Sequence, residues 1–381
     1  MSNFVLAFLA NVFFSAPSIF LVVVSSHFGS FDEVALLGAS FAICAPVQLF
    51  FSMQHNVSIL AGRLSISDSL RTRVVLVIPF LLCGVLGSLY FSSLIIFWFF
   101  LYRCAEFLYE PFLCDRIRKG AYRMACMQSF LRFLVFSSIV LVLFYQGVGL
   151  GNVLLALGAV FSLLALKSIY VAFTEGAFSS DGLYLGVAAF LSSFIVNIPR
   201  YYVTEADPSF AAFYSSMLTL VLGGGLLYGA FNNYAFPKFS VSGKSGAFKF
   251  LNVSMGVFVV GLLLSFLLFS SDVISSLFLQ LFLGEKYLQY SGLVIGFAVF
   301  YFVLYFHAAL NFLFVYFGLG RLYMGSLMVY GISMIAYVYI RLNVLLDDFS
   351  SLIWIVAGFG VSYALISYVF LMSKFVRGCE K

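Results

Sequence analysis

Long apolar runs alternate with short polar segments along the whole chain. A bilayer core about 30 Å thick needs roughly 20 apolar residues in a helix to cross it. Runs of about this length predict twelve spans, at 4–26, 34–58, 74–90, 92–114, 124–145, 150–172, 183–204, 209–235, 250–270, 287–317, 322–340 and 351–373. A run at 273–283 is too short to cross and predicts an interfacial helix. We therefore predict an all-α polytopic membrane protein.

The basic residues between the spans predict an orientation. Of the 20 Lys and Arg residues, fourteen, including Arg73, fall in alternate connecting segments and the C-terminal tail. Only Lys286 and Arg341 fall in the opposite set, where acidic residues collect instead. The positive-inside rule then predicts that both termini are cytoplasmic. The net charge of +5 follows from this topology, so it gives no reason to expect a nucleic-acid partner.

Twelve spans with both ends on one side divide into two halves. We predict an N-terminal six-helix bundle at 1–177 and a C-terminal six-helix bundle at 178–381, arranged around a central cavity. The composition, 63% hydrophobic and 9% charged, excludes an ordinary soluble domain. The three histidines and the scattered cysteines suggest no metal site, and no cofactor is expected.

The fourth span, "IIFWFFLYRCAEFLYEPFLC", carries charges on one helix face. Arg103, Glu106 and Glu110 are spaced i, i+3 and i+7. Arg132 in the fifth span lies at the same depth as Glu106, so the two pair if these helices are neighbours. Such a pair is either a structural ion pair or part of a charged cavity wall. Both glutamates are candidates to bind a coupling ion. Glu110 has no equally evident partner apart from Arg103, so it is the better candidate to carry a proton.

The seventh span ends in "SSFIVNIPRYYVTEADP", where Asn197 and Arg200 continue one polar stripe. Pro199 removes a helix hydrogen bond and frees the carbonyl of Ile195, which predicts a hinge. Pro46 in the second span predicts a second hinge for the same reason. Arg200 either lines a cavity and binds an anion, or extends to the outer interface while its stem stays in hydrocarbon.

Four stretches, 38–63, 103–132, 197–203 and 283–294, resemble Wzx-type O-antigen flippases of the multidrug/oligosaccharidyl-lipid/polysaccharide (MOP) exporter superfamily. The resemblance implies a carrier, not an enzyme, that flips undecaprenyl-diphosphate-linked oligosaccharides across the bacterial inner membrane for O-antigen or capsule synthesis. It also implies that a cationic central cavity binds the substrate, and the residues expected there are Arg103, Arg132, Asn197 and Arg200.

The same resemblance implies a set of partners. These are the lipid-linked substrate, membrane lipids, a proton or sodium ion for coupling and, as candidates, a polysaccharide polymerase and a chain-length regulator. The chain carries no nucleotide-binding motif, so an ion gradient or the substrate gradient must drive transport.

Three alternatives remain open. A drug or metabolite exporter of the same superfamily is expected to carry a carboxylate in the first span, and 4–26 contains none. A membrane glycosyltransferase or polymerase needs a sizeable outer loop, whereas the largest outer segment here is about 271–286. A structural scaffold is disfavoured, because charges inside spans are expensive and usually functional.

Overall fold

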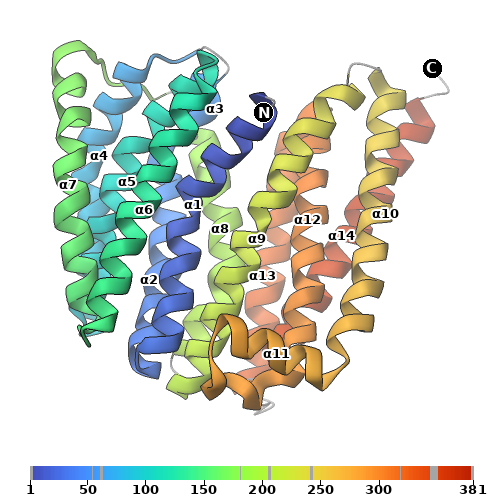
Figure 1. The fold of residues 1–381 in the computed structure, drawn as a ribbon. Coiled ribbons are helices and arrows are strands. Elements are labelled where there is room, and N and C mark those ends of the chain that lie inside the picture. The colour runs from blue at the N-terminus through green and yellow to red at the C-terminus, as the bar shows by residue number, and fades with distance from the viewer. Residues whose placement is uncertain are drawn as a thin grey trace. The chain divides into compact units, whose positions relative to one another are not determined.

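The computed structural model describes residues 3–53, 55–60, 63–180, 182–204, 207–240, 243–317, 319–343 and 351–378. Figure 1 shows that the elements in these ranges are helices. They are α1 (Asn3–Phe28), α2 (Phe31–Ser52), α3 (His55–Leu60), α4 (Ile66–Tyr90), α5 (Leu94–Arg118), α6 (Tyr122–Tyr145), α7 (Leu150–Glu175), α8 (Leu183–Thr204), α9 (Pro208–Ser240), α10 (Gly243–Phe269), α11 (Asp272–Phe282), the 3₁₀ helix η1 (Glu285–Leu293), α12 (Val294–Tyr316), α13 (Gly320–Asn343) and α14 (Leu352–Gly378).

The twelve predicted spans correspond to the twelve long helices in the described part of the chain. Nine stretches there are long and apolar enough to cross a membrane. Helix α5 is not among them, because it carries Arg103, Glu106 and Glu110 within one apolar stretch. The short helix predicted at 273–283 is also present, as α11. The multi-pass, all-α architecture is therefore confirmed.

Two spans are interrupted where the sequence predicts continuous helices. Helix α2 ends at Ser52, and Met53 takes a left-handed conformation with φ of 48° before the short helix α3 begins. The span predicted at 287–317 begins instead in η1, and α12 follows from Val294. The first interruption matters for the site, because α3 brings Asn56 against α4.

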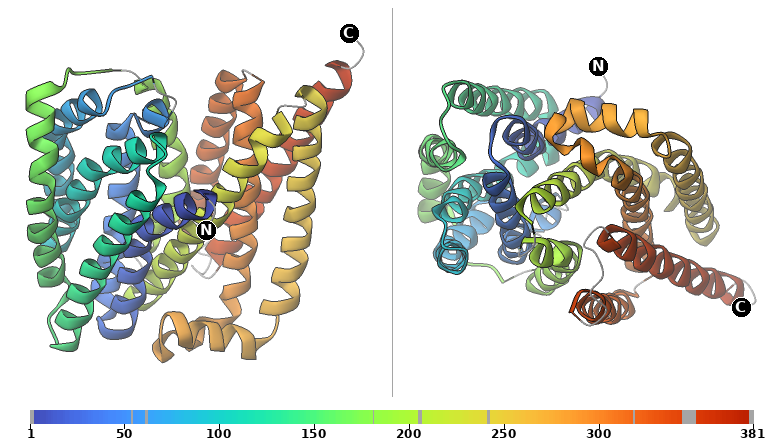
Figure 2. Two further views of the ribbon diagram at one scale, coloured as in Figure 1. Left: turned by 45° about the horizontal axis from the view of Figure 1, so that its top comes forward. Right: turned by 90° about the horizontal axis from the view of Figure 1, so that it is seen from below.

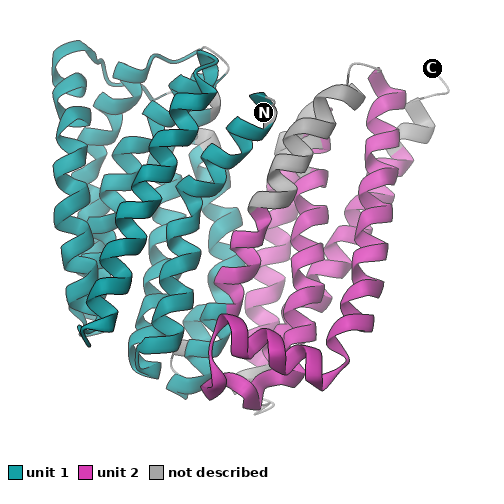
Figure 3. Cartoon of the chain, viewed as in Figure 1, with its two compact units in different colours: residues 1–216 teal, residues 217–381 magenta. Residues whose placement is uncertain are grey.

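Two compact units, residues 1–216 and residues 217–381, divide the chain (Figure 3). Within the first unit, α1 packs on α6, α5 packs on α4 and α7, and α2 packs on α5 and α8, and Figure 2 shows these helices end-on. Within the second unit, α12 packs on both α10 and α14. The boundary falls inside α9, because α8 and the start of α9 pack with α2. The six-plus-six division at 177 and the central cavity stay predictions.

Small residues allow the close approach of α2 to α8 and α9. A Cβ atom on Gly38 would lie 2.2 Å from the Cβ of Ser215, so only glycine fits there. Gly182 has a φ of +84°, and a Cβ on it would lie 2.1 Å from the carbonyl oxygen of Met53. Gly186 approaches the carbonyl oxygen of Phe50 in the same way. This small-residue packing, typical of membrane helices, holds α8 against the end of α2.

Candidate functional site

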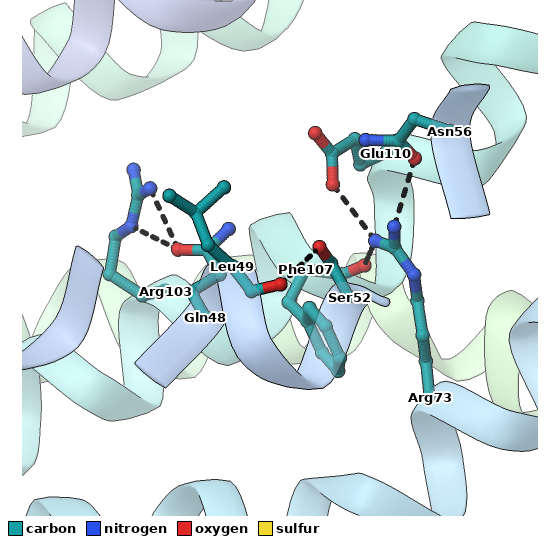
Figure 4. A network of polar contacts seen from close by, with 8 residues as sticks. All are labelled: Gln48, Leu49, Ser52, Asn56, Arg73, Arg103, Phe107 and Glu110. Carbon is teal, nitrogen blue, oxygen red and sulfur yellow. Dashed lines mark hydrogen bonds and ion pairs between the residues drawn. The ribbon is translucent and has the colours of Figure 1, made fainter. Parts of the chain in front are cut away.

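Arg103 lies in the middle of α5, and its guanidinium contacts two other helices. Nε and Nη2 both donate to Oε1 of Gln48 on α2, at 3.0 and 2.8 Å, as Figure 4 shows. Nη1 donates to Oγ of Ser18 on α1 at 3.1 Å, and it also forms an ion pair with Glu106 one turn along α5. The Arg103 side chain remains 20% exposed. Gln48 and Ser18, both uncharged, were not predicted as site residues.

Glu106 is buried, with 6% of its side chain exposed. One carboxylate oxygen accepts from Arg103 and the other accepts from the hydroxyl of Tyr102. The predicted pairing with Arg132 is wrong, because in the described chain the arginine that forms an ion pair with Glu106 is Arg103, three residues back on α5. Equal depth in two spans does not fix which way each helix is rotated.

Arg132 contacts aromatic rings instead. Its guanidinium carbon lies 3.7 Å from the ring centroid of Tyr109 and 5.1 Å from that of Phe161. Such a cation–π contact stabilises a desolvated cation by about 2 kcal/mol. Arg132 thus lies close to the face of α5 that carries Glu106, but it is held by the faces of these rings.

Arg73 is the centre of a second cluster, which Figure 4 shows. Its side chain is fully buried on α4 and its Nη1 pairs with Oε2 of Glu110 at 2.9 Å. Nη2 donates to Oδ1 of Asn56 on α3 at 2.9 Å, and Nη1 also donates to the carbonyl of Phe107. Pro111 lacks the N–H that would normally bond this carbonyl. Arg73 therefore satisfies the backbone group that a proline inside α5 leaves free.

Two predictions about this cluster are wrong for one reason. The sequence places Arg73 in a connecting segment and offers Glu110 no evident partner except Arg103. Helix α4 begins at Ile66 and not at 74, so Arg73 lies two turns inside it. The sequence carried a signal, because Ser65 caps α4 by accepting from the backbone N–H of Asp68 at 3.0 Å, and a serine followed three residues later by an acid is typical of a helix start.

Arg200 lies on α8 and is 1% exposed. Its Nη1 donates to Oδ1 of Asn197 at 2.9 Å, and its Nη2 donates to the carbonyl of Ser215 on α9 at 2.8 Å. Asn197 in turn donates to the carbonyl of Ser193 at 2.8 Å. The alternative in which Arg200 extends to the outer interface is wrong, because the guanidinium is enclosed between α8 and α9.

Tyr201 links α8 to the proline of α2. Its hydroxyl donates to the carbonyl of Ala42 at 2.7 Å. Ala42 lies four residues before Pro46, so its carbonyl has no N–H donor within its own helix. Pro46 and Pro111 thus follow the same rule, since each frees a carbonyl that a side chain from another helix satisfies. The hinge roles of Pro46 and Pro199 stay predictions.

The Tyr201 contact predicts a specific coupling with Pro46. Replacing Tyr201 by Phe should lower the free energy of unfolding by about 1 kcal/mol, because the Ala42 carbonyl loses its donor. In a Pro46→Ala background the effect should shrink, since the new N–H can bond Ala42 within α2. Thermal unfolding in detergent measures the cycle, with Tyr145→Phe at an exposed tyrosine as the control. Equal effects in both backgrounds would contradict this assignment.

Comparisons with known proteins show which solved structures share the fold of this chain. No protein-family profile and no curated protein sequence matches the chain. Solved structures do match over nearly the whole chain. The eukaryotic MATE transporter AtDTX14 is 14% identical, with 99% of each chain covered and a TM-score of 0.62. A multidrug-resistance MATE transporter of the MOP superfamily, in an outward-facing conformation, is 12% identical, with coverage of 99% and 97% and a TM-score of 0.60.

A third solved structure is a MOP superfamily transporter from Pyrococcus furiosus, described as having a binding pocket of reverse polarity. It is 12% identical, with 99% of this chain and 98% of that chain covered and a TM-score of 0.58. At these identities the likeness concerns the fold alone. The chain therefore has the fold of MOP superfamily transporters, and it is a multi-pass membrane protein.

Proposed function

We propose that the chain flips undecaprenyl-diphosphate-linked oligosaccharides from the cytoplasmic to the periplasmic leaflet of the bacterial inner membrane. The observation that carries this proposal is Arg103, an arginine inside a membrane helix that is still 20% exposed. A diphosphate is at least doubly negative, and its passage through hydrocarbon without partners is prohibitive. The planar donor fork of arginine matches phosphate oxygens and stays charged when desolvated.

The charged side chains whose contacts between helices are described above support an anionic substrate. Among these side chains, four arginines accompany two glutamates. The arginines are Arg73, Arg103, Arg132 and Arg200, and the glutamates are Glu106 and Glu110. This excess of positive charge favours an anion over a cation. In the proposal Arg103 and Arg132 bind the substrate first, and motion about the hinges Pro46 and Pro199 opens the buried Asn197 and Arg200 to it. Glu106 or Glu110 binds a proton or sodium ion.

A multidrug or metabolite exporter of the same superfamily is the second candidate. Glu110 favours it, because a carboxylate with 23% of its side chain exposed offers a cationic drug one anionic contact. Solved structures of the same fold include a multidrug-resistance transporter. Against it, helix α1 carries no carboxylate. Both candidates share the proposed orientation, with the two termini in the cytoplasm, and only the flippase has a polysaccharide polymerase and a chain-length regulator as candidate partners.

A transport assay separates the two candidates. The full chain, reconstituted in liposomes, should move a fluorescent prenyl-diphosphate-linked oligosaccharide between leaflets, as measured by the fraction that a membrane-impermeant quencher reaches. It should not accumulate a cationic dye such as ethidium under a proton gradient. Dye accumulation without movement of the lipid-linked sugar would overturn the flippase and favour the drug exporter.

A further inference from the structure

The two arginine–glutamate pairs on α5 differ in which partner is accessible. In the pair formed by Arg103 and Glu106, the arginine side chain is 20% exposed and the glutamate is 6% exposed. In the pair formed by Arg73 and Glu110, the arginine is fully buried and the glutamate is 23% exposed. An incoming anion can therefore reach the cation of the first pair but not that of the second.

The second pair is also fixed in place. Arg73 donates to the Phe107 carbonyl that Pro111 leaves free and to Oδ1 of Asn56, in addition to Glu110. If Arg73 turned away, a buried carbonyl would lose its donor, which is unfavourable in a membrane. Arg73 is therefore a structural cation, and Glu110 stays neutralised whether or not a ligand is bound.

In the first pair, Arg103 and Glu106 can each take a different partner. Besides Glu106, Arg103 contacts the uncharged side chains of Gln48, Ser18 and Cys44 in the described chain, and none of these contacts opposes an approaching anion. Glu106 keeps the Tyr102 hydroxyl when Arg103 leaves, but this donor carries no charge. A buried carboxylate that loses its counter-charge is strongly disfavoured, and binding a proton is the way it avoids this penalty.

We infer that Glu106 takes up a proton from solvent when a diphosphate binds Arg103. The phosphate and the carboxylate compete for the same Nη1 donor, so that substrate binding and protonation promote each other. This inference rests on the proposed function and assigns the proton site to Glu106, whereas Glu110 keeps the Arg73 partner that the sequence alone did not reveal.

One ionisable group near Glu106 could neutralise it in place of a proton when Arg103 leaves. The ionisable groups that act on the pair are Tyr102, Cys44, Glu110 and Arg132. Of the charged groups on the other helices packed against α5, Arg73 of α4 is paired with Glu110, and Lys167 of α7 lies over the ring of Phe112. Among these described groups, Arg132 is the cation that could neutralise Glu106 in place of Arg103, and it would first have to leave the Tyr109 ring. If it does so, no proton is taken up.

Calorimetry tests this exchange. Farnesyl diphosphate is titrated into the full chain in detergent, at a pH where the ligand is fully ionised, in buffers of different ionisation enthalpy. The dependence of the heat on the buffer should give uptake of about one proton per ligand bound. Glu106→Gln should still bind the ligand but take up no proton, and Glu175→Gln, at an exposed carboxylate of α7, should leave both binding and proton uptake unchanged. Neutral farnesol should cause no uptake.

The other outcomes separate the inference from the proposed function. Binding without proton uptake in the unmodified chain, or uptake that persists in Glu106→Gln, would overturn the exchange and leave the flippase standing. Uptake lost in Glu110→Gln but kept in Glu106→Gln would reverse the assignment. Absence of any farnesyl diphosphate binding would overturn the proposed function itself.

Discussion

Replacing Arg73 by Gln should destabilise the first unit more than any other single change in a charged residue of this site. The glutamine is shorter and uncharged, so it cannot reach Glu110, the Phe107 carbonyl and Asn56 together. Removing one partner of a buried ion pair lowers the free energy of unfolding by about 3–5 kcal/mol. The lower end applies here because Glu110 is 23% exposed. Thermal unfolding of the purified chain in detergent measures the loss.

Arg71→Gln is the matched control for this prediction. Arg71 lies two residues earlier on α4 and is only partly buried, with its guanidinium 4.5 Å from the ring centroid of Phe173. Its loss should lower stability by less than about 1 kcal/mol. A double variant, Arg73→Met with Glu110→Leu, should recover part of the stability, because no unpaired charge remains. If Arg73→Gln unfolds no more readily than Arg71→Gln, the cluster has no structural role.

The positions of the membrane-spanning helices could be predicted from the sequence, because the bilayer imposes a strong rule on any segment that crosses it. A spanning helix must bury its backbone polar groups in its own hydrogen bonds, so length and hydropathy alone locate it. Even the short turn between Tyr90 and Leu94 forms where the spans predicted at 74–90 and 92–114 place it. The interruptions after Ser52 and before Val294 could not be predicted, because the mean hydropathy of a span does not detect a local change of backbone conformation. Met53 lies between the polar residues Ser52 and Gln54, and its left-handed conformation ends α2.

Part of the site could be predicted from the sequence, and the predictions that are wrong share a physical cause. Helical spacing correctly grouped Arg103, Glu106 and Glu110 on one face, because that spacing is a property of one helix. Partners on other helices depend on helix rotation and on where each helix begins, which a single sequence does not fix. Arg73 shows the difference, since a shift in the start of α4 moved it from a loop to the protein interior. The two prolines with tertiary donors, Pro46 and Pro111, could be identified only once those donors were visible.

Replacing Arg200 by Met should slow transport about tenfold or more without unfolding the protein. The buried guanidinium donates to Asn197 and to the Ser215 carbonyl. That carbonyl lies inside α9, where the helix supplies a backbone donor of its own, so the oxygen that loses its donor is Oδ1 of Asn197. Removing the buried charge also removes the cost of its desolvation, which offsets this loss, so the melting temperature should change little. Hydrogen bonds to charged groups contribute about 1.5–3 kcal/mol, so losing a substrate contact should slow flipping about tenfold or more.

Lys167→Met is the matched control for the Arg200→Met variant. Lys167 is also a cation within a predicted span, but it lies exposed on α7 with Nζ 5.9 Å from the ring centroid of Phe112. Its loss should change neither the melting temperature nor the rate at which the lipid-linked sugar reaches the opposite leaflet. If Arg200→Met flips the substrate at the unmodified rate, Arg200 has no part in binding. If it melts early instead, then the guanidinium serves to fasten α8 to α9, and the anion must be held by Arg103 and Arg132 alone.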